Sequence, residues 1–518
     1  RPSCKAGRLL GSLGSPARCG RLDSSGEGRA EGGGSRKAGS WRRGCGAASL
    51  MAYAPTLAWK GLEGPEEAHL VATATTRMAK YAEFLKIPSV SALPENAADC
   101  RAAAEWLAAE LRRIGAERVE VSETGGHPIV VAEKIVNSSL PTVVIYGHYD
   151  VQPGDPLDLW KTSPFEPIVR DGRMLGRGSA DDKGQIVIHL SALEALVTTR
   201  GTLPVNVKYV FEGEEESSSV NLESWMAANP ERCSGDAVII SDSGFFDGNR
   251  PALTVGLRGI TYIQVDVRAS DVDLHSGSYG GSVVNPANAL AAMIASLHDA
   301  NGHITVPGFY DDVVALTPAD RAAFAALPFD EPGYLAGIGA TATAGESGFS
   351  TVERRGGRPT LDVNGIWGGF MGDGSKTIIP AHAHAKISCR LVTAQDPEKI
   401  SRQLEAALRA AAPAGLQVEV QNLGNGDAFL TPLGDPYLNA AAGALEATFG
   451  VPPLYIREGG SIPIAALFQK ELGLPVVLLG FTPPDDNAHA PNESMDLGNF
   501  EGGIRAVIRA LDAIATVG

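Results

Sequence analysis

The sequence Thr142-Val-Val-Ile-Tyr-Gly-His-Tyr-Asp150 indicates the fold, because it has the pattern of a buried strand that ends in polar groups. Its first five residues are apolar or β-branched, as in a buried strand, and a histidine and an aspartate follow almost directly. Three further apolar runs also lead into polar groups: Val205–Phe211 into Glu212-Gly-Glu-Glu-Glu216, Ala237–Ile240 into Ser241-Asp242-Ser243, and Val476–Leu479, through a proline-rich loop, into Asp485, Asp486 and His489. Each of these four predicted strands therefore ends in groups that can bind cations.

The order of the predicted elements indicates that these groups meet in space. From Glu66 onward helical and strand-like patterns alternate, which is typical of an α/β fold. Groups beyond the carboxyl ends of strands in an open α/β sheet converge on one crevice. Asp181 lies in Gly176-Arg-Gly-Ser-Ala-Asp-Asp-Lys-Gly184, on a loop that opens a predicted helix. Surface loops are often acidic without binding a ligand, but two histidines and several carboxylates on converging loops suit divalent cations.

Composition limits the classes of partner. A chain of 518 residues exceeds what one hydrophobic core usually organises, so we expect two domains, or one domain with a large insertion. The net charge of −16 disfavours nucleic acid and anionic membrane surfaces, and no apolar run is long enough to span a bilayer. The six cysteines lack the spacing of zinc or redox motifs. We therefore expect a cytoplasmic protein with reduced thiols that acts on a small substrate.

Residues 1–50 differ in composition from the rest of the chain. They hold ten Lys or Arg against three acidic residues, with many Gly and Ser and no apolar periodicity. Arg1 is not an initiator, whereas Met51 opens ordinary protein sequence. We expect residues 1–50 to be a non-native or disordered leader rather than part of the fold. A transit peptide is the alternative, although the amphipathic Leu/Arg pattern of such peptides is missing.

Five sequence motifs resemble one known enzyme family. They are Tyr146-Gly-His-Tyr-Asp-Val-Gln-Pro153, Gly176–Gly184, Glu212-Gly-Glu-Glu-Glu-Ser217, Leu274-His-Ser-Gly-Ser-Tyr-Gly-Gly281 and Arg457-Glu-Gly-Gly-Ser-Ile-Pro463. The chain resembles the dinuclear-metal peptidases that include cytosolic nonspecific dipeptidase, carnosinase, aminoacylase and glutamate carboxypeptidase, and it is most similar to the dipeptidase branch. The resemblance implies a mixed-sheet α/β catalytic domain, residues 51–255 and 427–518, with an inserted α+β lid and dimerisation domain, residues 256–426.

The resemblance also implies two divalent metal ions per subunit, Zn²⁺ or Mn²⁺. Its implied ligands are a shared carboxylate, Asp181, with His148 and Asp242 on one ion and Glu216 and His489 on the other. Glu215 is the implied general base, because Ser217 aligns with the family's Glu-Glu-Ser and this register leaves Glu214 outside the ligand set. Asp150 is expected to orient the His148 imidazole, and the Asp181–Asp182 peptide is expected to be cis.

The implied reaction is hydrolysis of the amide bond in dipeptides that have a free C-terminal carboxylate. The implied substrate-binding residues are Arg390 for that carboxylate, Glu458 for the free amino group, and Thr377, Ser461 and Asn425. Carnosinase-type dipeptidases carry a His where this sequence has Asn425, which leaves the substrate preference open. A homodimer formed through the lid is also implied, in which His275 serves the partner's site as an oxyanion stabiliser.

Two other functions remain open at this point. A deacylase of N-acyl amino acids would use the same two-metal site and differ in whether the substrate has a free amino group. A non-catalytic binding relative is disfavoured, because a binder needs neither Glu215 nor a full ligand set. The sequence disfavours a serine hydrolase, because Gly-Gly-Ser461-Ile-Pro lacks the second glycine of a nucleophile elbow.

Overall fold

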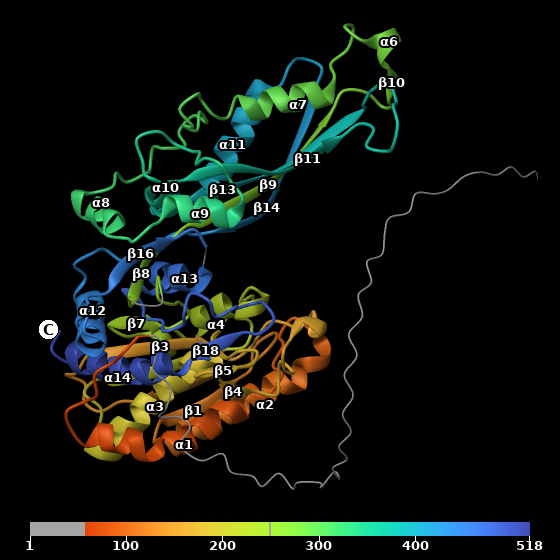
Figure 1. The fold of residues 1–518 in the computed structure, drawn as a ribbon. Coiled ribbons are helices and arrows are strands. Elements are labelled where there is room, and N and C mark those ends of the chain that lie inside the picture. Colours follow the sequence, from red (N-terminus) through yellow and green to blue (C-terminus); the bar gives the residue numbers. More distant parts are fainter. Residues whose placement is uncertain (1–56, 248–249, 461, 518) are drawn as a thin grey trace, which may run out of the picture. The chain divides into compact units, whose positions relative to one another are not determined.

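The computed structural model describes residues 57–247, 250–460 and 462–517, which belong to one compact unit. Residues 1–50, predicted to be a leader, lie outside these ranges. Within the described ranges the strands form sheets of nine, four, three and two strands (Figure 1). The nine-stranded sheet has the order β1-β2-β6-β3-β7-β17-β8-β15, and β16 also pairs with β8. Its strands are β1 (Glu117–Ser122), β2 (Ile129–Lys134), β3 (Thr142–His148), β6 (Asn206–Glu212), β7 (Ala237–Ile240), β8 (Ala252–Leu257), β15 (Phe429–Leu430), β16 (Leu454–Glu458) and β17 (Val476–Leu478).

The nine-stranded sheet is mixed, as the resemblance to the peptidase family implies. β3 is parallel to β6 and β7, and β17 is parallel to β7. By contrast, β1, β2 and β6 pair antiparallel, as do β15 and β8. The parallel strands β3, β6 and β7 are buried nearly throughout, because a strand covered on both faces has no side that faces water.

Helices cover both faces of this sheet, and alternate residues of β3 show why. Val143 and Ile145 pack into one hydrophobic core, whereas Val144 and Tyr146 pack into a second one. The first core includes residues of α1 (Pro65–Leu85), α2 (Ala97–Arg113), α3 (Lys183–Arg200), α12 (Pro436–Phe449) and α14 (Leu497–Ile514). The second includes residues of α4 (Leu222–Ala228), α5 (Pro230–Cys233) and α13 (Pro463–Leu472). The result is a three-layer α/β/α arrangement that holds the strand ends rigidly.

Local sequence fixes several helix ends. α7 (Pro286–Ala295), α11 (Pro397–Ala411) and α12 each begin with a proline that follows an Asn or Asp. In all three the Asn or Asp side chain accepts two backbone N–H groups of the first turn, and the proline lacks the N–H that would have no helical partner. α12 ends at Gly450, whose φ of 77° suits glycine.

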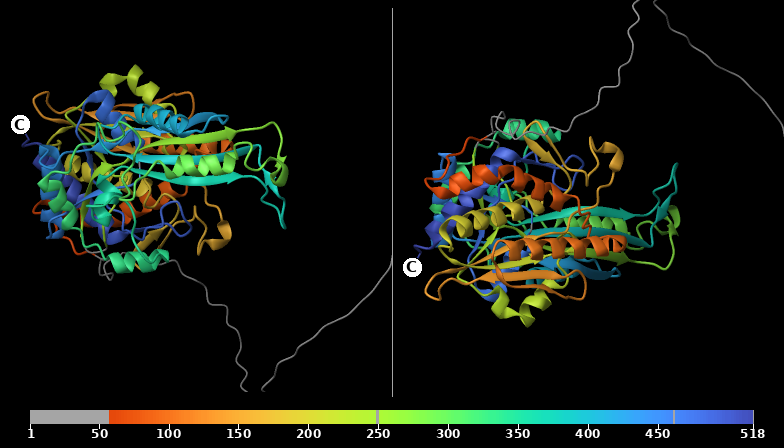
Figure 2. Two further views of the ribbon diagram at one scale, coloured as in Figure 1. Left: turned by 90° about the horizontal axis from the view of Figure 1, so that it is seen from above. Right: turned by 90° about the horizontal axis from the view of Figure 1, so that it is seen from below.

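The four-stranded sheet is made entirely of residues between β8 and β15. It is antiparallel, with the order β11-β13-β9-β14, where β9 is Gly259–Arg268, β11 Thr360–Gly368, β13 His382–Leu391 and β14 Gln417–Gly426. Alternate residues of β9 and β13 are buried, and they form a separate core with α7 and α11, which lie along this sheet (Figures 1 and 2). Within residues 256–426 the sequence pattern predicts strands near 262–267 and 383–391 and helices near 285–297 and 398–412, and these correspond to β9, β13, α7 and α11.

The remaining elements are short. β4 (Ile168–Arg170), β5 (Arg173–Leu175) and β18 (Ser494–Asp496) form the three-stranded sheet, and β10 (Leu274–His275) pairs with β12 (Ile378–Ile379). The short helices are η1 (Pro94–Asn96), η2 (Leu157–Leu159), η3 (Glu215–Ser217), α6 (Ser276–Tyr279), α8 (Pro318–Ala325), α9 (Glu331–Ile338) and α10 (Thr351–Gly357). Among the described residues no helix has the length and apolar character needed to cross a membrane. Cys100, Cys233 and Cys389 are buried and form no disulfide.

Candidate metal centre

The parallel strands place several polar side chains at one edge of the nine-stranded sheet. β3, β6, β7 and β17 run in the same direction, so their carboxyl ends lie at that edge. β3 ends at His148, η3 follows β6, and Asp242 comes two residues after the end of β7. The loop that carries Asp181 leads directly into α3. Segments far apart in the sequence thus meet where the sequence predicts a crevice.

Two groups of these side chains could each hold a metal ion. In the first group, His148 Nε2 lies 2.9 Å from Asp181 Oδ1, and Asp242 is the third member. In the second group, His489 Nε2 lies 3.0 Å from Asp181 Oδ2 and 3.0 Å from Glu216 Oε2. The candidate ligand atoms of a group lie within 4.8 Å of one another. Asp181 therefore belongs to both groups and turns a different carboxylate oxygen toward each histidine.

Asp150 connects two of the loops that carry these residues. His148 Nδ1 lies 3.2 Å from the backbone oxygen of Asp150 and 3.4 Å from its Oδ1. The Asp150 carboxylate also accepts hydrogen bonds from the backbone N–H groups of Glu215 (3.3 Å) and Glu216 (3.0 Å). A proton on Nδ1 leaves the lone pair of Nε2 directed at Asp181 and the first group. Asp150 thus orients the imidazole and also fixes the backbone of η3.

The Asp181–Asp182 peptide, in the loop before α3, is cis, as expected. This loop and its neighbours are also held by contacts that the sequence did not indicate. Asp182 Oδ2 accepts the backbone N–H of His148 at 3.1 Å, and Gln152 Nε2 donates to Glu216 Oε2 at 2.8 Å. Glu493 accepts four hydrogen bonds from residues 177–181. Nothing in the local sequence distinguishes these side chains from exposed ones, because their roles depend on burial and on partners distant in the chain.

The three consecutive glutamates after β6 have different surroundings. Glu216 belongs to the second group. The carboxylate of Glu214 accepts hydrogen bonds from Asn221 Nδ2 at 2.8 and 3.0 Å and from the backbone N–H of His127 at 3.0 Å. Glu214 thus belongs to neither group. Glu215 lies between these two, at the start of η3.

The charges at this edge suit divalent cations. Burial and the nearby Asp181 carboxylate raise the pKa of Asp242 to about 7. Burial raises the pKa of Glu215 to about 9; the His148 imidazole acts against this shift, and the Asp242 and Asp181 carboxylates add to it. Hydrogen bonds to Asp181 and Glu216 raise the pKa of His489 to about 10. A divalent cation in each group would offset the repulsion among the carboxylates, and imidazole and carboxylate are ligands that Zn²⁺ and Mn²⁺ accept.

The other predicted site residues lie on the four-stranded sheet, the β10–β12 pair and β16, outside both metal groups. His275 is exposed and lies on β10, which pairs with β12. Beside this pair, the N–H of Ser276 donates to the backbone oxygen of Thr377 at 3.1 Å. Figure 1 shows β10 and α6 at one end of the four-stranded sheet, with β8 and β16 toward the other end. Arg390 is on β13, and Asn425 on β14 accepts a hydrogen bond from Thr261 at 2.7 Å. Glu458 ends β16, and Ser461 lies outside the described residues.

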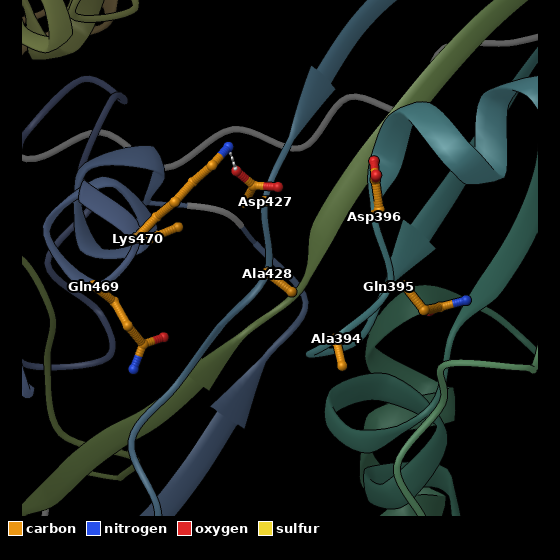
Figure 3. A pocket seen from close by; sticks show the side chains of 8 residues that line it. Ala394, Gln395, Asp396, Asp427, Ala428, Gln469 and Lys470 are labelled. Carbon is orange, nitrogen blue, oxygen red and sulfur yellow. Dashed lines mark hydrogen bonds and ion pairs between the residues drawn. The ribbon is translucent and has the colours of Figure 1, made fainter. Parts of the chain in front are cut away.

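A cavity of about 240 Å³ lies elsewhere, where β14 leads back to the nine-stranded sheet (Figure 3). It is lined by Ala394, Gln395, Asp396, Asp427, Ala428, Ala466, Gln469 and Lys470. Figure 3 shows Lys470 pointing toward Asp427, and the two form an ion pair of 2.8 Å. The lining includes none of the predicted catalytic or metal-binding residues, so we place no chemistry in this cavity.

Comparison with known proteins identifies relatives over most of the chain. The family model described as "Peptidase family M20/M25/M40" matches residues 144–513. The Cys-Gly metallodipeptidase dug1 of Schizosaccharomyces pombe is 33% identical over 85% of this chain and 96% of its own length. The human Beta-Ala-His dipeptidase is 34% identical over 73% of this chain and 76% of its own length.

Two solved structures share both fold and sequence with this chain. The M20 family metallo-carboxypeptidase Sso-CP2 from Sulfolobus solfataricus has a TM-score of 0.73 and 32% identity, with 85% of this chain and 99% of that chain covered. The di-peptidase Dug1p from Saccharomyces cerevisiae has a TM-score of 0.67 and 30% identity, with 86% of this chain and 96% of that chain covered. The family match, residues 144–513, covers the four-stranded sheet and both candidate metal groups.

Proposed function

Because this chain belongs to peptidase family M20/M25/M40, we propose that it is a dipeptidase that hydrolyses the amide bond of dipeptides with a free C-terminal carboxylate. Membership of the family makes the chain a metallopeptidase, and so a hydrolase that depends on bound metal. The observation that carries the proposal is that Asp181 contributes one oxygen to each of two adjacent groups, which is the geometry of a carboxylate shared by two cations.

The proposed metal ligands are those of the two groups. His148, Asp181 and Asp242 would hold one divalent cation, and Asp181, Glu216 and His489 the other. We infer Zn²⁺ or Mn²⁺, because both accept mixed nitrogen and oxygen ligands. Bound in this way, two cations supply Lewis-acid polarisation of a carbonyl and lower the pKa of water.

Glu215 is the proposed general base. It would accept a proton from the attacking water and return it to the leaving amine. Its backbone is held by Asp150, which also faces His148 Nδ1, so one side chain would position both the base and a metal ligand. Burial, which raises the pKa of Glu215, matches a group that must take up a proton and release it again.

Of the proposed substrate-binding residues, Arg390 and Asn425 lie on the four-stranded sheet and Glu458 ends β16. Arg390 would bind the substrate carboxylate, Glu458 the free amino group, and Thr377, Ser461 and Asn425 would complete the pocket. We further propose that residues 256–426 form a lid and dimerisation domain inserted between catalytic segments 51–255 and 427–518, and that His275 serves the site of a partner copy. The unpaired buried cysteines support our inference of a reducing, cytoplasmic location.

Relatives that are themselves named dipeptidases favour a dipeptide over an N-acyl amino acid as the substrate. The test is to remove bound metal, restore it as Zn²⁺ or Mn²⁺, and compare hydrolysis of Ala-Ala, Cys-Gly and β-Ala-His with that of N-acetyl amino acids. We expect metal-dependent hydrolysis with a higher kcat/KM for the dipeptides. A higher kcat/KM for the N-acetyl amino acids would replace the dipeptidase with the deacylase, and metal-loaded protein that cleaves neither class would contradict both.

A further inference from the structure

Glu493 is a fully buried carboxylate beside the candidate metal centre, with 0% of its surface exposed. Its Oε2 accepts hydrogen bonds from Arg177 Nη1 at 2.8 Å and from the backbone N–H of Gly178 at 2.9 Å. Its Oε1 accepts the backbone N–H groups of Ala180 at 2.8 Å and Asp181 at 3.1 Å. All four partners are donors, so both carboxylate oxygens act only as acceptors.

These hydrogen bonds fix the backbone of the loop that carries Asp181. The loop precedes α3, so its N–H groups have no helical partners, and a buried N–H without a partner is costly. A carboxylate surrounded by successive backbone N–H groups accepts hydrogen bonds from all of them. Of the three backbone N–H groups that Glu493 accepts, the last belongs to Asp181 itself. The carboxylate oxygens of Asp181 lie 2.9 Å from His148 Nε2 and 3.0 Å from His489 Nε2. Moving this backbone would therefore move the carboxylate that the two groups share.

Glu493 is also tied to the loop that carries His489. It lies four residues after His489, and its backbone oxygen accepts the N–H of Gly176 at 3.0 Å. The next residue, Ser494, donates its N–H to the oxygen of Asp486 at 2.8 Å and begins β18, which pairs with β5. Through its backbone and its side chain, Glu493 holds the 176–181 loop against the 486–493 loop, and these loops carry two of the three members of the second group.

We propose that Glu493 is a positioning residue of the metal centre, which sets the placement of Asp181 relative to His489 without touching the reacting atoms. This inference rests on the proposed function, because it takes Asp181 and His489 to be metal ligands. It predicts that the Glu493 carboxylate determines how tightly the centre binds metal.

The informative substitution is Glu493→Gln, which keeps the shape of the side chain and replaces one oxygen with an NH₂ group. Each oxygen of Glu493 accepts two hydrogen bonds, so the amide nitrogen removes two of them and faces donors with a donor. Groups that orient metal ligands typically change metal affinity by about 10- to 100-fold when replaced. We expect the dissociation constant for Mn²⁺ to rise by that factor, and kcat to recover largely when Mn²⁺ is saturating.

The matched control is Asp496→Asn, three residues further along the chain. Asp496 is also 0% exposed, and its carboxylate accepts the backbone N–H groups of Gly498 at 2.8 Å and Asn499 at 3.0 Å at the start of α14. Both hydrogen bonds go to Oδ1, and an Asn side-chain oxygen can accept them, so the same acid-to-amide change there should leave Mn²⁺ affinity near that of the wild type.

The measurement is calorimetric titration of metal-free full-length protein with Mn²⁺, together with thermal unfolding of each variant. Weakened binding in Glu493→Gln but not in Asp496→Asn supports the proposal. Wild-type affinity in Glu493→Gln, or equal weakening in both variants, overturns it. Should Glu493→Gln not fold, Glu493→Asp, whose shorter carboxylate cannot reach both pairs of donors, must bind Mn²⁺ more weakly for the proposal to stand. An Asp181→Ala variant distinguishes failure of the Glu493 proposal from failure of the proposed function. Wild-type metal binding in Asp181→Ala would show that the proposed metal ligands are wrong.

Discussion

Glu214, Glu215 and Glu216 are identical in the sequence but differ in their surroundings. Asn221 and a backbone N–H hold the first, and His489 and Gln152 contact the third. Among the described residues the Glu215 side chain has no such hydrogen-bond partner, but Asp150 accepts the Glu215 backbone N–H. Without bound cations, burial raises its pKa to about 9; cations held in the two groups would lower this pKa and favour the carboxylate that can accept a proton. Among the three, Glu215 is the side chain suited to accept a proton during a reaction.

Glu215→Gln should therefore lower kcat by on the order of 10²-fold or more, the range expected for loss of a general base, while fold and metal content are retained. Steady-state kinetics with elemental analysis of the same preparation measure both quantities. Glu214→Gln is the control, because its carboxylate is bound to Asn221, and it should keep near-normal kcat. Near-normal turnover in Glu215→Gln would move the base to another residue.

His189 gives a prediction about stability and pH. The buried imidazole donates from Nε2 to Ser241 Oγ at 2.6 Å, and burial lowers its pKa from 6.5 to about 4. As the pH falls below 6.5, the unfolded chain binds a proton at this residue, but the folded protein does not until about pH 4. The free energy of unfolding should fall across this window by about 3 kcal/mol from this group.

The measurement is denaturant unfolding at several pH values between 7 and 4, for the wild type and for His189→Gln. The amide can still donate to Ser241 but does not titrate, so the variant should lose less stability across the window than the wild type does. Because other groups titrate in both proteins, the difference between the two curves is the quantity of interest. Parallel curves would show that His189 does not contribute.

At the scale of elements, the segment between α7 and β11 supports the end of β16. Arg457 pairs with Asp320 of α8, and its guanidinium lies over the Phe324 ring at 5.6 Å. In α10 a Cβ at Gly356 would collide with the Arg457 carbonyl, so the two backbones are in close contact. Glu458, which we propose to bind the substrate amino group, follows directly. Elements between α7 and β11 thus fix the end of β16, a strand of the nine-stranded sheet.

Arg457→Met should therefore raise KM for dipeptides by about tenfold, because loss of a charge-assisted hydrogen bond costs roughly 1.5–3 kcal/mol, and should change kcat less. Arg321→Met is a matched control: Arg321 pairs with Glu353 at 2.7 Å and lies over the Phe349 ring at 5.2 Å, but these partners are not part of β16. Steady-state kinetics on one dipeptide should show the rise in KM only in Arg457→Met. An equal rise in both would indicate general destabilisation of the region.

At the scale of the whole molecule, the groups proposed for catalysis are divided between two sheets. The metal groups lie at the strand ends of the nine-stranded sheet, whereas Arg390 and Asn425 lie on the four-stranded sheet. The His275 side chain is exposed, and its Nδ1 accepts the backbone N–H of Gly277 at 3.0 Å. It belongs to neither metal group of its own chain. This placement supports the proposal that His275 acts in the site of a second copy.

Mixing two inactive variants tests that proposal. His275→Ala should lower kcat by roughly 10²-fold or more without loss of metal, because a donor to the developing oxyanion is worth about 3 kcal/mol. In a heterodimer of His275→Ala with Glu215→Gln, one site keeps its own Glu215 and the partner's His275, while the other site lacks both. Activity should therefore rise when the two variants exchange subunits.

Native mass spectrometry establishes whether subunits have exchanged, and mixtures of each variant with itself provide the baseline. Exchange without a gain in activity would mean that His275 acts within its own chain or not at all. A monomeric protein that is fully active would contradict the shared-site dimer altogether.

The resemblance to the peptidase family named the five residues that the structure gathers into two groups, and the sequence pattern by itself determined the α/β class and which loops lie together. It could do so because parallel strands deliver whatever follows their carboxyl ends to one edge, so that order along the chain predicts proximity. Only the tertiary structure decided which neighbouring groups hold those residues. Glu493 and Asp181 are 312 positions apart, and their hydrogen bond exists because β18 pairs with β5. Burial and long-range hydrogen bonding depend on the packing of distant segments, which no local pattern records.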